Sequence, residues 1–408
     1  MTFTNLRHLR VLLAVEDTGS LTLAAGCCNV SQPAVTQSLA KLETLAGGPL
    51  YLRSNKGVFI TERGQLLVRR VRRAFALLDQ GLEGVSPRAG QIVSFSQLTA
   101  LIAVCDAENF TLAARRLGRA QPTVHRAVTQ LEQEAGRDLF NRTPYGVVPT
   151  RSCQVVARAA LLAFAELDQA RAELAELDGR EAGRIVIGAL PLARSVMLPQ
   201  ALTRFRRRRP RLPVIVNDGP YKDMLGALRR GQIDVIVGAL RDPAPVDDIV
   251  QEPLFEDRLL VLAAPDHPMA DERSIDPALI ADSQWVVPRA GSPARAQFDI
   301  FFATATGRDS PASMIEAGSI LLMRELLRSG DFLGCISGWQ AEAEITKGLL
   351  VPLEIEWDFP GRPIGLTHRL DWRPTAAQAE LLQELRDAAT GAKAIPGSGR
   401  PQSRTARS

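Results

Sequence analysis

The chain has 408 residues, of which 46% are hydrophobic and 23% charged, and its formal net charge is +4. This length accommodates two to four domains, and the composition is that of a globular protein rather than a fibrous or disordered one. No apolar run approaches the length of a membrane span, and no signal-peptide pattern opens the chain. We therefore expect a cytoplasmic protein with no membrane partner.

Positive charge gathers at the N-terminal end, where residues 1–90 hold 11 Lys or Arg against 6 Asp or Glu. A basic N-terminal half suits a polyanionic partner. The five cysteines and four histidines show no CxxC motif and no metal-ligand spacing. We therefore expect no metal ion and no cofactor.

Three helices are predicted at the start of the chain. Apolar residues recur at helical spacing in the first, at Leu6, Leu9, Leu12 and Leu13. Gly19 and Ser20 end this helix, and Ser20 or Thr22 can cap a short second one. After a turn at residues 28–30, Ser31 caps a third helix that carries Pro33 in its first turn. The stretch 50–61 then favours a β-hairpin with Gly57 at its tip, which reads as a wing carrying Arg53 and Lys56.

The whole pattern returns 89 positions later, starting at Leu98. About a third of the positions between 6 and 61 are identical in the two copies, which indicates a duplicated domain. Each copy is followed by a long stretch of helical apolar periodicity, at Gln65–Leu82 and at Gln154–Leu177. Two short helices joined by a tight turn, with a hairpin behind them, predict a winged helix-turn-helix domain in each copy.

The third helix of such a unit enters the major groove of DNA by its N-terminal end. Side chains there that can reach base edges are Gln32, Thr36 and Gln37 in the first copy, and Gln121, Thr123, His125 and Arg126 in the second. Gln pairs with adenine and Arg with guanine, so the two copies should prefer different bases. Arg53 and Arg142 on the wings would contact phosphates.

The segment GSLTLAAGCCNVSQPAVTQSLAKLE, with LYLRSNKGVFITERG behind it, resembles the N-terminal domain of LysR-type transcriptional regulators. In that family a long linker helix follows the wing and pairs two subunits. The resemblance implies one set of DNA-contacting residues in the first copy: Gln32, Pro33, Thr36, Gln37 and Arg53. By the repeat offset it implies a second set: Gln121, Pro122, His125, Arg126 and Arg142.

Both copies depart from the family pattern. Gln37 stands where many members carry Arg, which weakens guanine reading by the first copy. The second copy has Ala120 in place of the capping Ser, which costs about 1 kcal/mol at the helix start. It also places Arg119 where the semi-buried Val30 stands. We therefore rank the first copy as the better DNA reader and consider a dimerisation role for the second.

Strands alternate with helices after the polar residues 179–183, which predicts a parallel α/β sheet. The expected strands are Arg184–Gly188, Val214–Val216, Asp234–Val237 and Leu259–Ala264, with helices at about Ala193–Arg208 and Lys222–Arg230. A second lobe is expected to begin at Pro265, and stretches 350–353 and 363–368 to return to the first lobe. The run Arg206–Arg209 reads as a solvated helix end.

The pattern from GRIVIGALPLARS to LRRGQIDVIVGA resembles the LysR-type effector domain, which shares the fold of periplasmic solute-binding proteins. Ligands of such folds bind at strand C-termini between the lobes. The pocket candidates are Leu190, Arg194 and Ser195 after the first strand, Gly219 after the second, and Arg241, Ser292, Arg295 and Ser337 in later loops. The three arginines could pair with a carboxylate effector.

The predicted fold class is thus α/β, with two tandem mainly-α winged helix-turn-helix domains before a two-lobed, periplasmic-binding-protein-like effector domain. We place the domains at 1–88, 92–178 and 183–375, with lobe I at about 183–264 and 345–375 and lobe II at about 265–344. A disordered tail is expected at 391–408.

The predicted function is a bacterial, nucleoid-associated transcriptional regulator that binds double-stranded DNA and a small-molecule effector as a homodimer or homotetramer. In one alternative, one helix-turn-helix copy serves only dimerisation. A cytoplasmic small-molecule-binding protein is a weaker alternative. An enzyme is not expected, because the chain has no Walker loop, GxSxG, HExxH or dinucleotide fingerprint.

Overall fold

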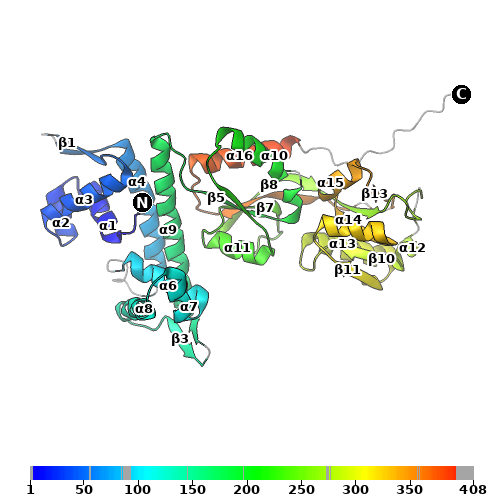
Figure 1. Cartoon of the computed structure of the whole chain (residues 1–408), viewed down its shortest axis with the longest axis horizontal. Helices are drawn as coiled ribbons and strands as arrows, with labels where there is room; N and C mark the ends of the chain where they lie inside the picture. The colour runs from blue at the N-terminus through cyan, green and yellow to red at the C-terminus, as the bar shows by residue number, and fades with distance from the viewer. Residues whose placement is uncertain are drawn as a thin grey trace. The chain divides into compact units, whose positions relative to one another are not determined.

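The structure is a computed structural model of the chain, which folds into two compact units divided near residue 185 (Figure 1). It describes residues 3–54, 57–83, 85, 93–144, 146–195, 197–272, 275, 277–355, 357 and 359–391. The wing residue Lys56 and the predicted tail beyond Gly391 lie outside these residues. Within the described part of the chain, no helix is both long enough and apolar enough to cross a membrane.

The N-terminal unit contains the same succession of elements twice. The first copy comprises α1 (Leu6–Thr18), α2 (Leu21–Cys27), α3 (Gln32–Ala46), β1 (Tyr51–Ser54), β2 (Gly57–Ile60) and α4 (Glu62–Glu83). The second comprises α6 (Phe95–Ala107), α7 (Phe110–Leu117), α8 (Gln121–Ala135), β3 (Phe140–Thr143), β4 (Gly146–Pro149) and α9 (Arg151–Leu177). In each copy the two strands form an antiparallel hairpin.

Side-chain caps set the helix starts in both copies. Ser20 accepts a hydrogen bond from the Leu23 amide and so begins α2, and Ser31 does the same for the Ala34 amide at the start of α3. Asn109 caps α7 in the second copy. Ala120 gives α8 no side-chain cap, as the sequence indicated, yet α8 and α3 both span 15 residues. Packing therefore holds α8 in place of the missing cap.

The two copies bury corresponding residues. The first copy buries Leu9, Leu12, Val35 and Leu39, and the second buries Leu98, Leu101, Val124 and Val128 at the matching positions. These side chains belong to one continuous core that runs through both copies. The duplication therefore preserves a packing scheme, although some buried positions differ, such as Leu39 against Val128 and Arg70 against Ala159.

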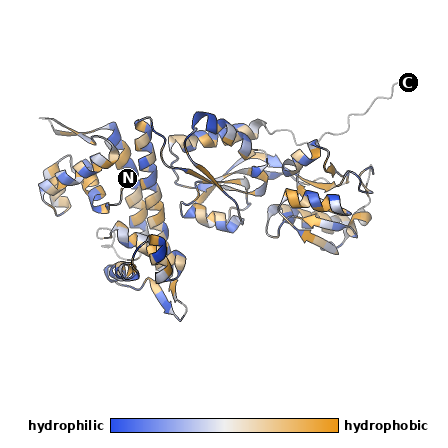
Figure 2. Ribbon diagram, viewed as in Figure 1, coloured by the Kyte–Doolittle hydropathy of each residue, from blue (hydrophilic) through white to orange (hydrophobic). Residues whose placement is uncertain are grey.

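Helices α4 and α9 pack against each other in antiparallel fashion (Figure 1). Arg63, near the start of α4, pairs with Asp178, just beyond the end of α9. Gly81, near the end of α4, lies against Ala159, near the start of α9. Bands of hydrophobic and hydrophilic residues alternate along α9 in Figure 2, as expected for a helix with one buried side.

The C-terminal unit contains two five-stranded sheets. The first has the order β6–β5–β7–β14–β8, from β5 (Ile185–Ala189), β6 (Val214–Asn217), β7 (Val235–Ala239), β8 (Ile249–Asp257) and β14 (Arg362–Arg369). The second has the order β11–β10–β12–β9–β13, from β9 (Leu259–Ala263), β10 (Gln284–Val287), β11 (Ser313–Glu316), β12 (Phe332–Ser337) and β13 (Val351–Pro352).

Helices cover these sheets. They are the short 3₁₀ helix η1 (Pro191–Arg194), α10 (Met197–Arg208), α11 (Tyr221–Arg229), α12 (Pro277–Ala281), α13 (Pro293–Thr306), α14 (Ile320–Ser329), α15 (Gly338–Thr346) and α16 (Ala376–Gly391). β5 and β7 are parallel, as are β10 and its neighbours β11 and β12. β14, however, is antiparallel to both β7 and β8, and β9 is antiparallel to both β12 and β13. Each sheet is therefore mixed, and the parallel arrangement predicted from the sequence holds for only part of each.

Two predicted lobe boundaries are wrong. The sequence places strand β9 in the first lobe, but it pairs with β12 and β13 in the second sheet. β13, within the stretch 350–353, also lies in the second sheet rather than returning to the first. The chain thus changes sheets between Asp257 and Leu259, and it returns before Arg362. The reason is that long-range strand pairing, and not sequence proximity, decides which sheet a strand joins.

The other corrections concern helices. The predicted helix at Ala193–Arg208 is two elements, because η1 ends at Arg194 and α10 begins at Met197. The effector domain also extends beyond residue 375, since α16 packs on α10. Arg208 lies 2.9 Å from Glu384 of α16, and Arg209 pairs with Glu380. The arginine run 206–209 is therefore part of a helix interface rather than only a solvated helix end.

Candidate functional site

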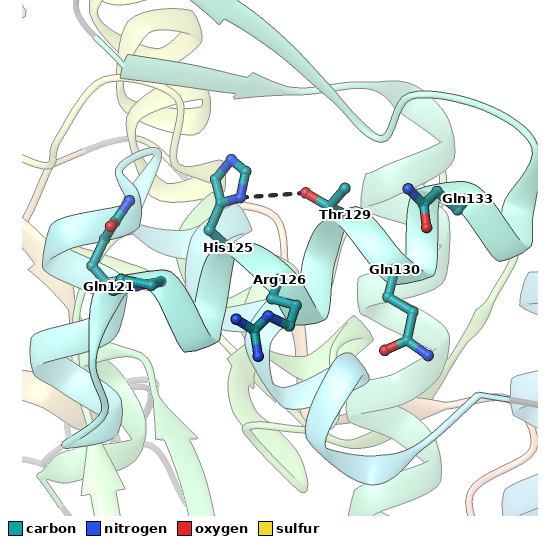
Figure 3. A pocket seen from close by; sticks show the side chains of 7 residues that line it. Gln121, His125, Arg126, Thr129, Gln130 and Gln133 are labelled. Atoms are coloured by element: carbon teal, nitrogen blue, oxygen red, sulfur yellow. Dashed lines mark hydrogen bonds between the residues drawn. The ribbon is translucent and has the colours of Figure 1, made fainter.

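Helix α8 presents a polar face that lines a surface pocket. The lining residues are Gln121, Pro122, His125, Arg126, Thr129, Gln130 and Gln133. Figure 3 shows that the labelled side chains all project from this one helix. Because helical residues four apart lie in a row, Gln121, His125, Thr129 and Gln133 form one row, and Arg126 and Gln130 form the next. The face therefore offers amide, imidazole, hydroxyl and guanidinium groups to one partner.

The N-terminal end of α8 is open to a partner. Gln121, Pro122 and Thr123 are exposed, and no side chain caps the helix there. The positive end of the helix dipole favours contact there with an anionic group such as a phosphate.

His125 is held in position by its neighbours. Its ring centroid lies 5.0 Å from that of Phe110, and its Nδ1 lies 3.4 Å from the Thr129 hydroxyl (Figure 3). Both contacts come from within the second copy. They fix the direction of the imidazole before any partner arrives, which reduces the entropy lost on binding.

The matching face of α3 has different chemistry. Gln32, Pro33 and Gln37 are exposed, and Thr36 is half-buried. These residues correspond to Gln121, Pro122, Arg126 and His125 of α8 through the 89-residue offset. Both helices thus present their first two turns, but only α8 adds a cation and an imidazole there.

Each hairpin carries an arginine at the equivalent position of its first strand. Arg142 is exposed on β3, where it lies opposite Val147 of β4. Arg53 occupies the corresponding place on β1, opposite Val58, but its side chain lies outside the described part of the structure, as does all of Lys56.

Arg119 does not disturb the second copy, although it replaces the half-buried Val30. Its side chain turns to the surface and donates a hydrogen bond to the Ser96 hydroxyl, with an N–O distance of 2.7 Å. Arg119 therefore gives no reason to rank the second copy below the first in DNA binding.

Like Leu190, four others of the eight effector candidates follow β5, β6 or β7 in the chain. Arg194 pairs with the exposed Asp218 at 2.6 Å, Ser195 and Gly219 are exposed, and Arg241 is half-buried. The Arg241 guanidinium lies 4.3 Å from the centroid of the Tyr221 ring. Burial lowers the pKa of Arg241 from its ordinary value, which marks a cation partly withdrawn from water.

The other candidates have defined structural contacts. Leu190 packs in an apolar cluster with Val186 and Ile236. Ser292 caps α13, and Arg295 pairs with Asp299 at 2.7 Å and with Glu316 at 3.3 Å.

Ser337 caps α15 and donates a 2.8 Å hydrogen bond to the buried carboxylate of Asp257. Asp257 in turn pairs with Arg362, at the point where β8 and β14 end and begin. This ion pair leaves no pattern in the sequence, because its members stand 105 residues apart. Burial raises the pKa of Asp257, although Arg362 and Ser337 oppose that shift.

Sequence reasoning also missed the part of the polar face that lies on the C-terminal turns of α8. Thr129, Gln130 and Gln133 continue the rows that start at Gln121 and Arg126, so helical spacing could have found them. It further missed Tyr221, whose ring lies beside Arg241. A ring-to-cation contact between separate elements leaves no pattern in one sequence.

Exposed recognition-type helices before a two-sheet α/β unit define the class of a DNA-binding regulator with a ligand-binding domain. The family model described as LysR substrate binding domain matches residues 178–390. The model described as bacterial regulatory helix-turn-helix protein, lysR family, matches twice, at residues 6–65 and 95–154. The chain belongs to the LysR family of transcriptional regulators.

The chain is 32% identical over 389 residues to the HTH-type transcriptional regulator GalR of Pseudomonas putida, which covers 95% of this chain and 98% of that protein. It is 30% identical over 315 residues to the regulator CbbR of Rhizobium meliloti, which covers 76% of this chain and 97% of CbbR. A match over 95% of the chain must include most of both N-terminal copies, whereas the match to CbbR covers only 76% of the chain.

Solved structures share the fold. Full-length OxyR from Pseudomonas aeruginosa, in a variant form, matches with a TM-score of 0.52 and 23% identity over 73% of this chain and 94% of that chain. Full-length LysG from Corynebacterium glutamicum, with bound effector Arg, matches with a TM-score of 0.52 and 22% identity over 72% and 97%. These structures show the fold, whereas the family models and the regulator GalR show a transcriptional regulator with a DNA-binding part and an effector-binding domain.

Proposed function

We propose that both N-terminal copies are winged helix-turn-helix domains in tandem, at about residues 1–88 and 92–178, and that both bind DNA. The observation that carries this proposal is the exposed polar face of α8, together with the equally exposed start of α3. Side chains at such helix starts reach base edges in the major groove. A copy kept only for dimerisation would not need an open polar helix start.

Each proposed DNA contact has a role that follows from its chemistry. Gln32, Gln37, Gln121, His125 and Arg126 would read base edges, and Thr36, Pro33 and Pro122 would pack beside the DNA. Arg142, Arg53 and Lys56 would contact phosphates on either side of the groove. Such a protein acts on the bacterial chromosome.

The direct experiment is a binding titration of the full chain on operator DNA at several salt concentrations. Phosphate contacts release counterions, so the logarithm of affinity should fall linearly and steeply with the logarithm of salt concentration. Binding that shows no salt dependence, or no binding at all, would contradict the proposal.

For the C-terminal domain, we propose a periplasmic-binding-protein-like sensor at about residues 183–391 that closes on a small anionic effector and acts in a homo-oligomer. The candidate pocket residues remain Leu190, Arg194, Ser195, Gly219, Arg241, Ser292, Arg295 and Ser337. Among the arginines, Arg194 and Arg295 already face carboxylates, whereas the described contacts of the Arg241 guanidinium are the Tyr221 ring and the Ala239 carbonyl. Arg241 is therefore the proposed partner of the effector's anionic group.

A thermal-shift screen of small carboxylic acids against their uncharged amides tests this assignment. Acids should stabilise the full chain, their amides should not, and Arg241→Leu should abolish the shift. Arg308→Leu is the matched control, since Arg308 is half exposed and pairs with Asp282 away from these loops. Acids that still stabilise Arg241→Leu would remove Arg241 from the site.

A further inference from the structure

The α4–α9 helix pair contains a buried charge cluster. Arg70 of α4 is 2% exposed, and its Nη1 lies 2.8 Å from a Glu166 oxygen and 2.7 Å from the Gln169 side-chain oxygen. Its Nε lies 3.1 Å from Glu173. Arg73 adds a second contact to Glu166, at 3.2 Å. One arginine of α4 is therefore neutralised by two carboxylates of α9, 96 and 103 residues away.

The same helix pair has a second contact that is related to the first by a local two-fold axis. Through the 89-residue offset, Arg70 of α4 corresponds to Ala159 of α9, and Gly81 corresponds to Ala170. Arg70 meets the α9 segment around Ala170, and Gly81 meets Ala159. A Cβ atom added at Gly81 would lie 2.2 Å from the Ala159 Cβ, so this contact accepts no larger residue without movement. One of the two equivalent contacts is thus charged and the other small and apolar.

This asymmetry makes pairing of like helices unfavourable. If two copies of α4 met in this geometry, each Arg70 would face Leu77, Gln80 and Gly84 in place of Glu166, Gln169 and Glu173. Its buried charge would meet no carboxylate at these three positions, which is strongly unfavourable.

Two copies of α9 would have the opposite defect. Glu166 and Glu173 would face Ala159 where Arg70 now stands, and Leu162 would replace Arg73. Only the outer contact of Arg69 with Glu173, at 3.6 Å, would keep a basic counterpart, in Arg158, and Arg69 is 65% exposed. An exposed ion pair of this kind contributes little to the free energy of helix pairing.

We propose that each chain supplies its own linker-helix pair, α4 with α9, and so presents two different recognition helices, α3 and α8, to two non-identical DNA half-sites. The buried charges select this pairing over α4 with α4 or α9 with α9. The two copies lie toward opposite ends of the helix pair (Figure 1). The binding of two half-sites rests on the proposed function, whereas the pairing of α4 with α9 within one chain does not.

The first experiment asks whether the pair forms within one chain. Arg63→Lys places an amine where Arg63 now pairs with Asp178, and a zero-length carbodiimide reagent can join the two. Unlabelled and ¹⁵N-labelled full chains are mixed, incubated and cross-linked. Mass spectrometry then measures the masses of the cross-linked peptides. We expect only light–light and heavy–heavy products. Light–heavy products in statistical amounts would show pairing between chains and overturn the proposal.

A matched control uses Arg72→Lys on the exposed side of α4, where Arg72 lies 2.7 Å from Asp17 of the same copy. It should give a cross-link to Asp17 and none to α9. This control confirms that the reagent reports proximity and that the chain folds with a lysine in α4.

The second experiment asks whether the charges select the pairing, and it uses thermal unfolding of the full chain without DNA. Arg70→Leu leaves two buried carboxylates without their cation, and Glu166→Leu with Glu173→Leu leaves Arg70 without carboxylates. Each should lower the unfolding midpoint by roughly 5–10 °C. All three changes together should restore most of it, because an apolar cluster can replace a buried ion cluster.

The outcomes of these experiments distinguish a failure of the helix pairing from a failure of the proposed DNA binding. Losses that simply add in the triple variant would show that these residues do not meet, which overturns the pairing. Recovery of stability with no DNA binding by the wild-type chain would leave the pairing intact and contradict the proposed function instead.

Discussion

The two N-terminal copies bury corresponding positions, but they differ in the side chains that they expose at the starts of α3 and α8. Leu9, Val35 and Leu39 of the first copy have buried apolar counterparts in the second, so the packing of the domain was retained after duplication. The starts of α3 and α8 diverged, with Thr36 and Gln37 in one and His125 and Arg126 in the other. A surface that changes while its core is kept indicates two readers with separate targets.

The largest expected effect concerns which copy contributes more to DNA binding. We predict that Arg53→Ala with Gln32→Ala weakens operator binding by about 100-fold, and Arg142→Ala with Gln121→Ala by about tenfold, since a base contact is worth about 1–3 kcal/mol. The ranking follows from the serine cap and the more basic surface of the first copy. Fluorescence anisotropy at one fixed salt concentration measures both.

Arg72→Ala on the exposed side of α4 serves as the control for this comparison, because its described partner is Asp17 of α1 and it belongs to neither α3 nor α8. It should leave affinity unchanged. If the second double variant proves more damaging than the first, the ranking of the copies is wrong and α8 is the stronger reader.

A smaller effect tests the apolar contact between α4 and α9. Gly81→Ala should destabilise the full chain by about 1–3 kcal/mol, because its methyl group would overlap Ala159. Adding Ala159→Gly moves the methyl group from one helix to the other and should restore most of the loss. Urea unfolding measures both variants.

Gly26→Ala is the matched control, because nothing lies within 4 Å of a Cβ added there. A glycine in a helix costs about 0.5–1 kcal/mol relative to alanine, so this change should be neutral or stabilising. If Gly81→Ala behaves in the same way as Gly26→Ala, the close approach of α4 and α9 is absent in solution.

The smallest expected effect concerns the helix caps. Ser31→Ala should cost about 0.5–1 kcal/mol of unfolding free energy, and Ala120→Ser should add a similar amount. The lower part of the usual range applies because the Ser31 hydroxyl lies 3.4 Å from the Ala34 amide. Thermal unfolding measures the stability of both variants and of the wild-type chain. Equal stability of these three proteins would show that the missing cap has no consequence for α8.

Local chemistry made the N-terminal fold predictable. Caps such as Ser31, turns such as residues 28–30 and apolar spacing such as Leu9 and Leu12 act over a few residues, so one sequence reveals them. The 89-residue offset then transferred each prediction from the first copy to the second, including the exposed helix start at Gln121.

Long-range pairing could not be predicted in the same way. Arg70 stands in the run Arg69–Arg73, which reads as a solvated basic helix face until Glu166 and Glu173 are brought beside it. Strand β9 reads as a neighbour of β8 until β12 pairs with it. One sequence fixes the periodicity of an element, whereas its partner depends on contacts a hundred residues away.

The most direct test of the account is a selection of duplex DNA from a random pool by the full chain, repeated with two variants. One variant carries Thr36→Ala and Gln37→Ala in α3, and the other carries His125→Ala and Arg126→Ala in α8. We predict a motif with two different halves, in which each variant alters only one half. A perfect inverted repeat, or variants that alter both halves together, would contradict two distinct readers in one chain.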